Sequence, residues 1–343
     1  MSMSGPYDAL LVVSFGGPEC REDVLPFLEN VLRGKRVSRE RMLEVAEHYY
    51  TFDGVSPINA RNRELIAALK WDFEQQGWKL PIYWGNRNWH PLLSDTVRTM
   101  KEDGVRRALA FVTSIFSSYS GCRQYLEDLE GARGEVGADA PVIDKLRSGF
   151  NHPRFIAAMA DRVQTALDRF PKGLREKTLV IFTAHSIPLA MADRCPYVPQ
   201  LQEACRLVAD AVAHAHWTLV YQSRSGPPQH PWLEPALCDF LRNLPSQGTG
   251  SRVLLVPIGF ISDHMEVLYD LDTEARQVCD ESGFTMTRAE TAGTHPEFIA
   301  MIRELVQERM GDHPQRKSLG RLEPSHDVCP ADCCSAGSHR AVS

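Results

Sequence analysis

Apolar runs of strand length alternate with helical patterns along most of the 343-residue chain. The strand-like runs are Ala9–Phe15, Pro81–Gly85, Ala108–Ile115, Leu179–Phe182, Thr218–Gln222, Val253–Phe260 and Phe284–Arg288. Amphipathic helical segments lie between them, from Glu22–Leu32 to Pro296–Met310. This order predicts an α/β fold in which helices cover both faces of parallel sheets. The runs form two groups, so we expect two doubly wound lobes, residues 7–150 and 151–310, with a cleft between their strand ends.

The composition is that of an ordinary globular protein and excludes several classes of function. Hydrophobic residues make up 43% and charged residues 24% of the chain, which are usual values. A net charge of −6 and a pI near 6.1 argue against a nucleic-acid-binding surface. No apolar run reaches the length of about 18 residues that a membrane span needs. The amino-terminal MSMSGPYDALLVV lacks the basic region of a signal peptide, so we expect a cytoplasmic protein.

Two of the apolar strands end in residues suited to metal and proton chemistry. Ser262-Asp263-His264-Met265-Glu266 follows the run Val253–Phe260, and His185 follows the run that begins at Leu179. Ligands of open α/β sheets bind at the carboxyl ends of the strands. An imidazole and a carboxylate at that edge can hold a divalent cation and accept a proton. The alternatives are a strand-end histidine satisfied by the backbone and a first-turn acid favoured by the helix dipole.

Acidic residues continue along the helix that Glu266 opens. Asp270 and Glu274 follow at intervals of one turn and share a face with Glu266. Such a stripe is either a solvated charged face or a path that conducts protons or cations away from Glu266. The spacing alone leaves both readings open.

The first half of the chain gathers aromatic and basic residues in loops that follow strands. They include Tyr49, Tyr50, Phe52, Trp84, Trp89, Tyr119 and Tyr125, together with Arg33, Lys35, Arg36 and Arg87. Gly16-Gly17 closes the first strand, but neither a dinucleotide-binding nor a P-loop glycine pattern is present. The concentration therefore favours a pocket for a large, planar, anionic molecule, which Trp232 can contact from the second half. Ser56, at a turn into a helix, has an N-cap as its ordinary role.

Six motifs, in this order, resemble the ferrochelatase family over residues 7–310. They are LLVVSFGGP, DGVSPI, the Asn86–Pro91 segment, FTAHSIP, YQSRSGPPQHPW and LLVPIGFISDHMEVLYDLD. The resemblance implies two Rossmann-like lobes around a porphyrin cleft. It also implies a lyase of haem biosynthesis whose substrates are a porphyrin and ferrous iron, Fe²⁺. The resemblance is also compatible with a downstream enzyme of the haem pathway as a protein partner.

The resemblance assigns roles to individual residues. His185 and Glu266 match the active-site histidine and its acidic partner, which bind iron and remove the pyrrole protons. An imidazole with a pKa near neutral suits the proton transfer. The supporting acidic path matches Asp263, His264, Asp270 and Glu274, and the porphyrin contacts match Phe15, Arg33, Tyr49, Ser56 and Tyr125. Many bacterial relatives carry a metal-ligating tyrosine at position 15, so Phe15 moves ligation toward His185 and Glu266.

The nine cysteines include a set that the family explains. Some ferrochelatases hold a [2Fe–2S] cluster with one internal cysteine and three near the carboxyl end. Cys122 stands at the internal position, and Cys329, Cys333 and Cys334 lie in the polar tail, residues 311–343. Four thiolates are the required number, and the cluster would dock the tail on the first lobe. A zinc site or a free, reactive tail are the alternatives.

Substrate choice follows from the same resemblance. No apolar membrane-binding lip is apparent, and GNRNWHP with SSYSGCRQY resembles the actinobacterial-like branch. Coproporphyrin III, with four carboxylates, is therefore favoured over protoporphyrin IX. The remaining alternatives are a cobalt or nickel chelatase of another tetrapyrrole and a non-catalytic haem or Fe–S sensor on the same fold.

Overall fold

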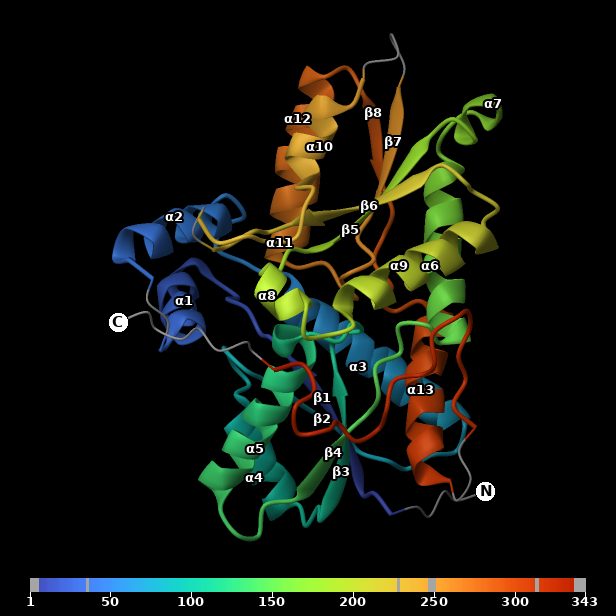
Figure 1. Cartoon of the computed structure of the whole chain (residues 1–343). Helices are drawn as coiled ribbons and strands as arrows, with labels where there is room; N and C mark the ends of the chain where they lie inside the picture. Colours follow the sequence, from blue (N-terminus) through green and yellow to red (C-terminus); the bar gives the residue numbers. More distant parts are fainter. Residues whose placement is uncertain (1–5, 35–36, 227–228, 246–250, 312–314, 336–343) are drawn as a thin grey trace.

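Two four-stranded, fully parallel sheets form the framework of the protein (Figure 1). The computed structural model describes residues 6–34, 37–226, 229–245, 251–311 and 315–335. The first sheet has the order β2-β1-β3-β4, with β1 Ala9–Ser14, β2 Ile82–Asn86, β3 Arg107–Val112 and β4 Val142–Lys145. The second has the order β6-β5-β7-β8, with β5 Leu179–His185, β6 Trp217–Gln222, β7 Arg252–Val256 and β8 Thr285–Arg288. The predicted α/β class is confirmed.

The strand order reverses at the same place in both sheets. After β1 the chain adds β2 on one side and β3 on the other, and β5 is flanked by β6 and β7 in the same way. A ligand crevice lies outside the carboxyl ends of the strands at such a reversal. In the second sheet this point lies between the ends of β5 and β7, the strands that precede His185 and Glu266.

The helices connect the strands and cover the sheets. The longer ones are α1 Val24–Leu32, α2 Arg39–Tyr50, α3 Ile58–Gln75, α4 Leu93–Glu102, α5 Gln124–Val136, α6 Pro153–Leu167, α9 Tyr197–Ala211, α10 Leu237–Asn243, α12 Arg276–Glu281 and α13 Pro296–Met310. The short ones are η1 Arg21–Asp23, α7 Lys172–Arg175, α8 Leu189–Ala192 and α11 Met265–Val267, and two π-helical stretches are η2 Tyr119–Arg123 and η3 Leu268–Ala275. None of the helices in the described ranges is both long and apolar enough to cross a membrane.

The two sheets share one continuous apolar core. Alternate residues of β1 point to opposite faces, so Leu11 packs with α4 and α5 while Leu10 packs toward α3. The core that contains Leu10 extends through α6 and α13 to Phe182 of the second sheet. Helix α13 contacts both α3 and α6. The division at residue 150 remains a prediction, because this core crosses it.

Two differences from the expected strands have simple causes. Strand β4 was not expected, since its four residues carry only one buried side chain, Ile143, and the pattern is too short to read. Strand β7 ends at Val256 rather than at Phe260 because Pro257 has no N–H to donate. The chain then turns at Gly259, whose N–H donates to Thr183 O at 3.0 Å.

The carboxyl-terminal segment is docked by specific hydrogen bonds rather than lying free. Asn151 accepts from Leu319 N–H at 2.9 Å and donates from Nδ2 to Leu322 O at 2.7 Å. Arg147, paired with Glu308, also donates to Lys317 O at 2.9 Å. Figure 1 shows this segment running past α13 toward the start of α5. The tail cysteines are thereby brought beside the first sheet.

Candidate active site and cysteine site

His185 and Glu266 meet at the strand-order reversal of the second sheet. His185 is the last residue of β5, and Glu266 lies in α11 after the turn that follows β7. His185 Nε2 lies 3.7 Å from Glu266 Oε2. Their side chains keep 31% and 46% of their surface exposed, so both remain accessible to a ligand.

The backbone fixes the tautomer of His185. Its Nδ1 lies against the carbonyl oxygen of Ser186, which can only accept a hydrogen bond. Nδ1 must therefore carry a proton, and in the neutral ring the lone pair is on Nε2. This is the nitrogen that faces Glu266. A backbone carbonyl on the second nitrogen is the usual arrangement of a metal-binding histidine.

The two side chains form an ion pair before any substrate arrives. Burial alone would lower the pKa of His185, but the charge of Glu266 and the Ser186 carbonyl outweigh it and raise the pKa to about 9. Burial would raise the pKa of Glu266, yet the His185 charge lowers it to about 2. This pKa lies well above the near-neutral value expected for His185, so at pH 7 the pair is an imidazolium beside a carboxylate.

His264 lies on the other side of the same carboxylate, with its Nε2 3.8 Å from Glu266 Oε2. Its Nδ1 accepts a hydrogen bond from Val267 N–H at 3.3 Å and caps α11. Burial lowers the pKa of His264, so the ring is neutral and its Nε2–H points toward Glu266. His264 therefore places a neutral polar group near the carboxylate.

The acidic stripe continues into η3, a π-helical stretch of the kind that often marks functional sites. Asp270 accepts hydrogen bonds from the Ser223 hydroxyl and from Gln222 Nε2. Burial first, and then the charge of Glu266, raise the pKa of Asp270 to about 7. Burial also raises the pKa of Glu274. Both carboxyl groups are thus tuned to exchange protons more readily than a solvated acid.

Asp263, by contrast, forms an ion pair that holds the turn before Glu266 in place. Arg288 in β8 donates to both of its carboxylate oxygens, at 3.1 and 3.2 Å. The same guanidinium donates from Nε to Asp272 Oδ1 at 2.8 Å. Asp263 is therefore neutralised by Arg288 and holds the segment that leads to Glu266.

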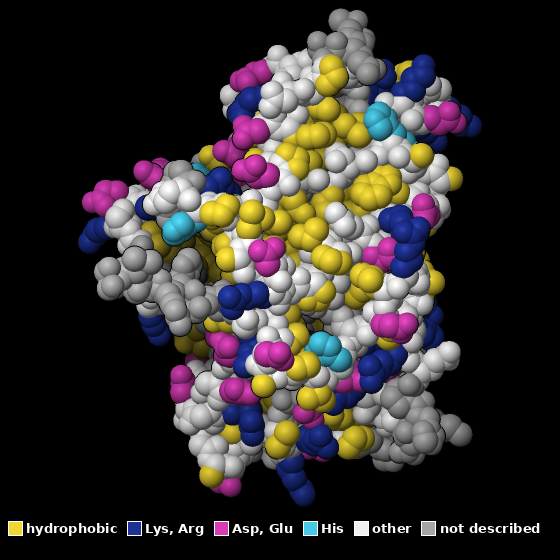
Figure 2. Space-filling view, viewed as in Figure 1, with side chains coloured by type: hydrophobic (Ala, Val, Ile, Leu, Met, Phe, Trp, Pro, Cys, Tyr) yellow, Lys and Arg dark blue, Asp and Glu magenta, His cyan; other side chains and the backbone are white. Residues whose placement is uncertain are grey.

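Aromatic side chains of the first half surround Phe27 and reach toward Glu266. The rings of Phe15, Tyr49 and Trp89 contact Phe27 edge-on, with centroids 6.2, 5.8 and 6.3 Å away. Burial and then the charge of Glu266 raise the pKa of Tyr49, which indicates that its hydroxyl lies within the field of that carboxylate. Figure 2 shows a hollow with hydrophobic side chains on its visible wall, beside the surface formed by α1 and α2.

A contact that the sequence did not predict joins α2 to η3. The ring of His48 stacks on Tyr269, with centroids 3.9 Å apart and planes 9° from parallel. His48 directly precedes Tyr49, and Tyr269 directly precedes Asp270. The stack therefore links the aromatic and acidic sides of the site.

The other expected porphyrin contacts lie in different settings. Arg33 is exposed at the end of α1 and donates to Asn30 Oδ1 at 2.6 Å. Trp232 pairs with Pro188, just beyond His185. Ser56 is buried against Gly17. Tyr125, in α5, is only 5% exposed and lies under Arg87, whose guanidinium also lies 5.7 Å from the ring centroid of Phe15.

The four expected cysteines come together at a second site. The thiols of Cys329 and Cys334 hydrogen-bond to Cys122 and lower its pKa. Cys333 Sγ lies 3.6 Å from Cys334 Sγ. Cys122 is presented by η2, the second π-helical stretch, and is buried. A cavity of about 310 Å³ borders Cys122, Cys329 and Cys333, so there is open space next to three of the four cysteines.

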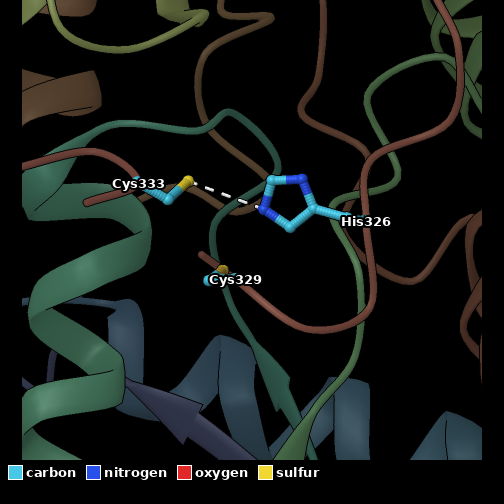
Figure 3. Close-up of side chains that lie close together, drawn as sticks. All are labelled: His326, Cys329 and Cys333. Carbon is cyan, nitrogen blue, oxygen red and sulfur yellow. Dashed lines mark hydrogen bonds between the residues drawn. The ribbon is translucent and has the colours of Figure 1, made fainter. Parts of the chain in front are cut away.

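His326 was not expected at this site. Its Nε2 lies 3.5 Å from Cys333 Sγ (Figure 3). The donor atoms of His326, Cys329 and Cys333 all lie within 4.8 Å of one another, a spacing that can hold a metal ion. The sequence signal was the H-x₂-C-x₃-C spacing, which the four-cysteine reading did not use.

Comparisons with known proteins identify the family of this chain. A model of the ferrochelatase family matches residues 7–310. This chain belongs to the ferrochelatase family. A ferrochelatase of Rhodopirellula baltica is 60% identical over 97% of this chain and 95% of its own length. The coproporphyrin III ferrochelatase of Streptomyces coelicolor is 48% identical over 98% of this chain and 96% of its own length.

Solved structures support the fold of this family member independently of sequence. SirB from Bacillus subtilis, solved with Fe³⁺, has a TM-score of 0.53 and 11% identity, covering 89% of this chain and 96% of SirB. A SirB structure with cobalt from the same species has a TM-score of 0.51 and 11% identity, covering 88% of this chain and 94% of SirB. At this identity the likeness shows the chelatase fold alone.

Proposed function

We propose that this protein inserts Fe²⁺ into coproporphyrin III, with His185 and Glu266 as the residues that meet the iron and the pyrrole protons. The observation that carries the proposal is the His185–Glu266 pair, 3.7 Å apart at the strand-order reversal. An imidazole nitrogen and a carboxylate oxygen suit Fe²⁺. Two protein ligands hold the ion loosely enough for it to pass to the four porphyrin nitrogens.

The reaction exchanges one Fe²⁺ for two pyrrole protons, so the site must handle cations of both kinds. At neutral pH the Nε2 of His185 carries a proton held by Glu266, as its pKa of about 9 requires. An arriving Fe²⁺ takes the place of that proton between the same two atoms. As the iron passes to the porphyrin, Nε2 becomes free to accept the two pyrrole protons in succession, the first passing on to the acidic stripe before the second arrives. Iron and protons thus use one position in alternation.

Protons leave the pair along the acidic stripe. Asp270, with a pKa of about 7, can take up and release a proton near neutral pH. Glu274 lies one turn further along η3, and its pKa is also raised. Gln222 Nε2 donates to the backbone carbonyl oxygen of Glu266 and to Asp270 Oδ2, each at 3.2 Å, and so holds the Asp270 carboxylate beside the start of η3. The raised pKa values of Asp270 and Glu274 favour proton conduction over a purely solvated face.

The porphyrin would lie in the hydrophobic hollow, against the aromatic side of the site. Phe15, Tyr49 and Trp89 supply ring edges and faces for a planar ligand. Arg33, exposed at the end of α1, can meet a carboxylate. Relatives at 45–48% identity bear the name coproporphyrin III ferrochelatase, which favours the substrate with four carboxylates.

We further propose that Cys122, Cys329, Cys333 and Cys334 hold a [2Fe–2S] cluster. The fit rests on the donor set, because Cys122, Cys329 and Cys333 border a cavity of about 310 Å³ and Cys334 adjoins both Cys122 and Cys333. Four thiolates are the common ligand set of this cluster. When bound, the cluster supplies iron–thiolate bonds that tie the tail to η2. His326 lies close enough to donate a hydrogen bond to Cys333.

The test of the substrate is an anaerobic comparison of coproporphyrin III and protoporphyrin IX with the purified protein and Fe²⁺. Loss of porphyrin fluorescence measures insertion. We expect kcat/KM for coproporphyrin III to exceed that for protoporphyrin IX by about tenfold or more, equivalent to about 1.4 kcal/mol. Equal values, or the reverse order, would refute the substrate assignment. Faster insertion of Co²⁺ or Ni²⁺ than of Fe²⁺ would refute the assignment of Fe²⁺ as the metal substrate.

A further inference from the structure

One face of α9 contacts both sites. Tyr197, Gln200 and Glu203 follow one another at intervals of about one turn, so they share a face. Their exposed fractions are 6%, 4% and 7%. Polar groups this deeply buried are usually held by specific partners, and each has one outside α9.

Gln200 holds the segment that leads to Cys122. Its Oε1 accepts from Ser117 N–H at 2.8 Å, and its Nε2 donates to Ser117 Oγ at 3.2 Å. The next residue, Ser118, caps η2 by accepting from Gly121 N–H at 2.9 Å. Gln200, Ser117 and Cys122 all border the cavity beside the cysteines. Both polar ends of the Gln200 amide are thus committed to the segment that presents Cys122.

Glu203 holds the tail that carries the other cysteines. Its carboxylate accepts from the backbone N–H of Arg321. Gly320 has a φ of +82°, and a side chain there would collide with that carboxylate. Glu203 therefore fixes the tail eight residues before Cys329 at a position that accepts only glycine.

Tyr197 holds His185. Its hydroxyl donates to the His185 carbonyl oxygen at 3.0 Å. Its ring also contacts Phe116 edge-on, with centroids 6.4 Å apart, and Phe116 directly precedes Ser117. The residue that fixes the end of β5 therefore touches the segment that leads to Cys122.

We propose that α9 couples occupancy of the cysteine site to the position of His185, with Gln200 and Tyr197 as positioning residues. The inference rests on the function proposed above for both sites. A group bound by Cys122 and the tail cysteines clamps the Ser117 segment and the tail onto α9. Its loss leaves the polar contacts of Gln200 and Glu203 and the Phe116–Tyr197 ring contact to hold that face. Tyr197 then holds the His185 backbone less firmly, while the porphyrin hollow is untouched.

Hydrogen–deuterium exchange of the full-length protein tests the coupling without relying on activity. Peptides covering residues 179–190 and 197–211 are followed in wild type, Cys333→Ser, Gln200→Met and Tyr197→Phe. We expect Cys333→Ser and Gln200→Met each to raise exchange in both regions by about fivefold or more, about 1 kcal/mol of local stability. Tyr197→Phe should abolish the response of residues 179–190 to Cys333→Ser while preserving that of α9. Cys20→Ser and Tyr83→Phe are the matched controls, since Cys20 is exposed and Tyr83 bonds Asp103 at the periphery.

The outcomes distinguish a failure of the coupling through α9 from a failure of the cluster assignment on which it rests. If purified wild-type protein contains no iron and no sulfide, the cluster assignment is refuted. The exchange of residues 179–190 in Gln200→Met then decides the coupling by itself. Unchanged exchange of residues 179–190 in Gln200→Met overturns the coupling. So does a response to Cys333→Ser that survives Tyr197→Phe.

The kinetics of iron insertion give a second test, because a purely structural role of Tyr197 would not change kcat alone. Tyr197→Phe should lower kcat for iron insertion about tenfold and leave porphyrin Kd within about twofold, because the hydroxyl acts on His185 and not on the hollow. Thermal melting checks that the variant is folded. A change confined to porphyrin binding would contradict the proposal.

Discussion

His185 Nε2 and Glu266 Oε2 lie 3.7 Å apart although the two residues are 81 positions apart in the chain. They are neighbours because β5 and β7 are adjacent parallel strands whose carboxyl ends share one edge. The Ser186 carbonyl orients the imidazole, and the His264 ring lies near the carboxylate, with its Nε2 3.8 Å from Glu266 Oε2. The pair is accordingly preorganised, and an incoming cation need only replace a proton.

Gly259→Ala should damage the active site through the backbone. A Cβ at position 259 would lie 2.7 Å from Ala184 Cα, next to His185, where no flexible side chain can yield. We expect about 2 kcal/mol of destabilisation and a lower rate of iron insertion, measured by denaturant unfolding and turnover. Gly131→Ala is the matched control, because its Cβ would meet nothing within 4 Å. The idea fails if both variants behave alike.

Arg33→Met should weaken porphyrin binding rather than the chemical step. The guanidinium is exposed and near one edge of the aromatic cluster, so its pair with a substrate carboxylate is worth about 1 kcal/mol. We expect KM for coproporphyrin III to rise about fivefold with kcat unchanged, and the wild-type KM to rise with salt more steeply than that of the variant. Arg39→Met, an exposed substitution in α2, serves as control. An unchanged KM would remove Arg33 from the porphyrin site.

Cys334→Ala should remove the cluster. Its thiol contacts Cys122 and Cys333, and its side chain is only 2% exposed. We expect the visible absorbance of the purified protein and its acid-labile sulfide to disappear, whereas Cys238→Ala in α10 should retain both. If the wild-type protein is purified with zinc and without sulfide, the site is a zinc site and the cluster assignment is wrong.

The structure also predicts a pH-dependent stability that comes from His152. This residue caps α6, and burial lowers its pKa from 6.5 to about 4. Between these values the unfolded chain is protonated at His152 and the folded protein is not, so stability falls as pH falls. From pH 7 to 5 the loss is about 2 kcal/mol. His152→Asn keeps a capping side chain. Between pH 7 and pH 5 the free energy of unfolding of this variant should fall by about 2 kcal/mol less than that of wild type. Urea unfolding at the two pH values measures the difference.

A matched control for His152 exists at the start of α13. His295 caps that helix in the same way, before Pro296, but its imidazole bonds the exposed Asp161. His295→Asn makes the same change of cap in α13 and therefore controls for the effect of the substitution itself. If the two variants have the same pH profile, His152 is not the group responsible.

Most of the framework could be predicted from the sequence because its periodicities are strong. Helix α13, for example, has the bounds Pro296–Met310 that the apolar pattern predicts. His185 and Glu266 stood out because strand ends in a parallel sheet converge. Contacts between distant segments carried no such signal: the His48–Tyr269 stack and the Tyr197 bond to His185 depend on how α2 and α9 pack. The raised pKa of His185 likewise follows from a neighbour that only the folded chain supplies.

The most direct test is single-turnover iron insertion by His185→Ala under anaerobic conditions, with coproporphyrin III binding measured on the same preparation. Without the imidazole, Fe²⁺ loses one protein ligand and the pyrrole protons lose their acceptor. We predict a rate reduced by about 1,000-fold, within the usual range for loss of an acid–base group, and a porphyrin Kd within about twofold of wild type. Turnover within about tenfold of wild type would show that His185 and Glu266 are not where the metal enters the ring.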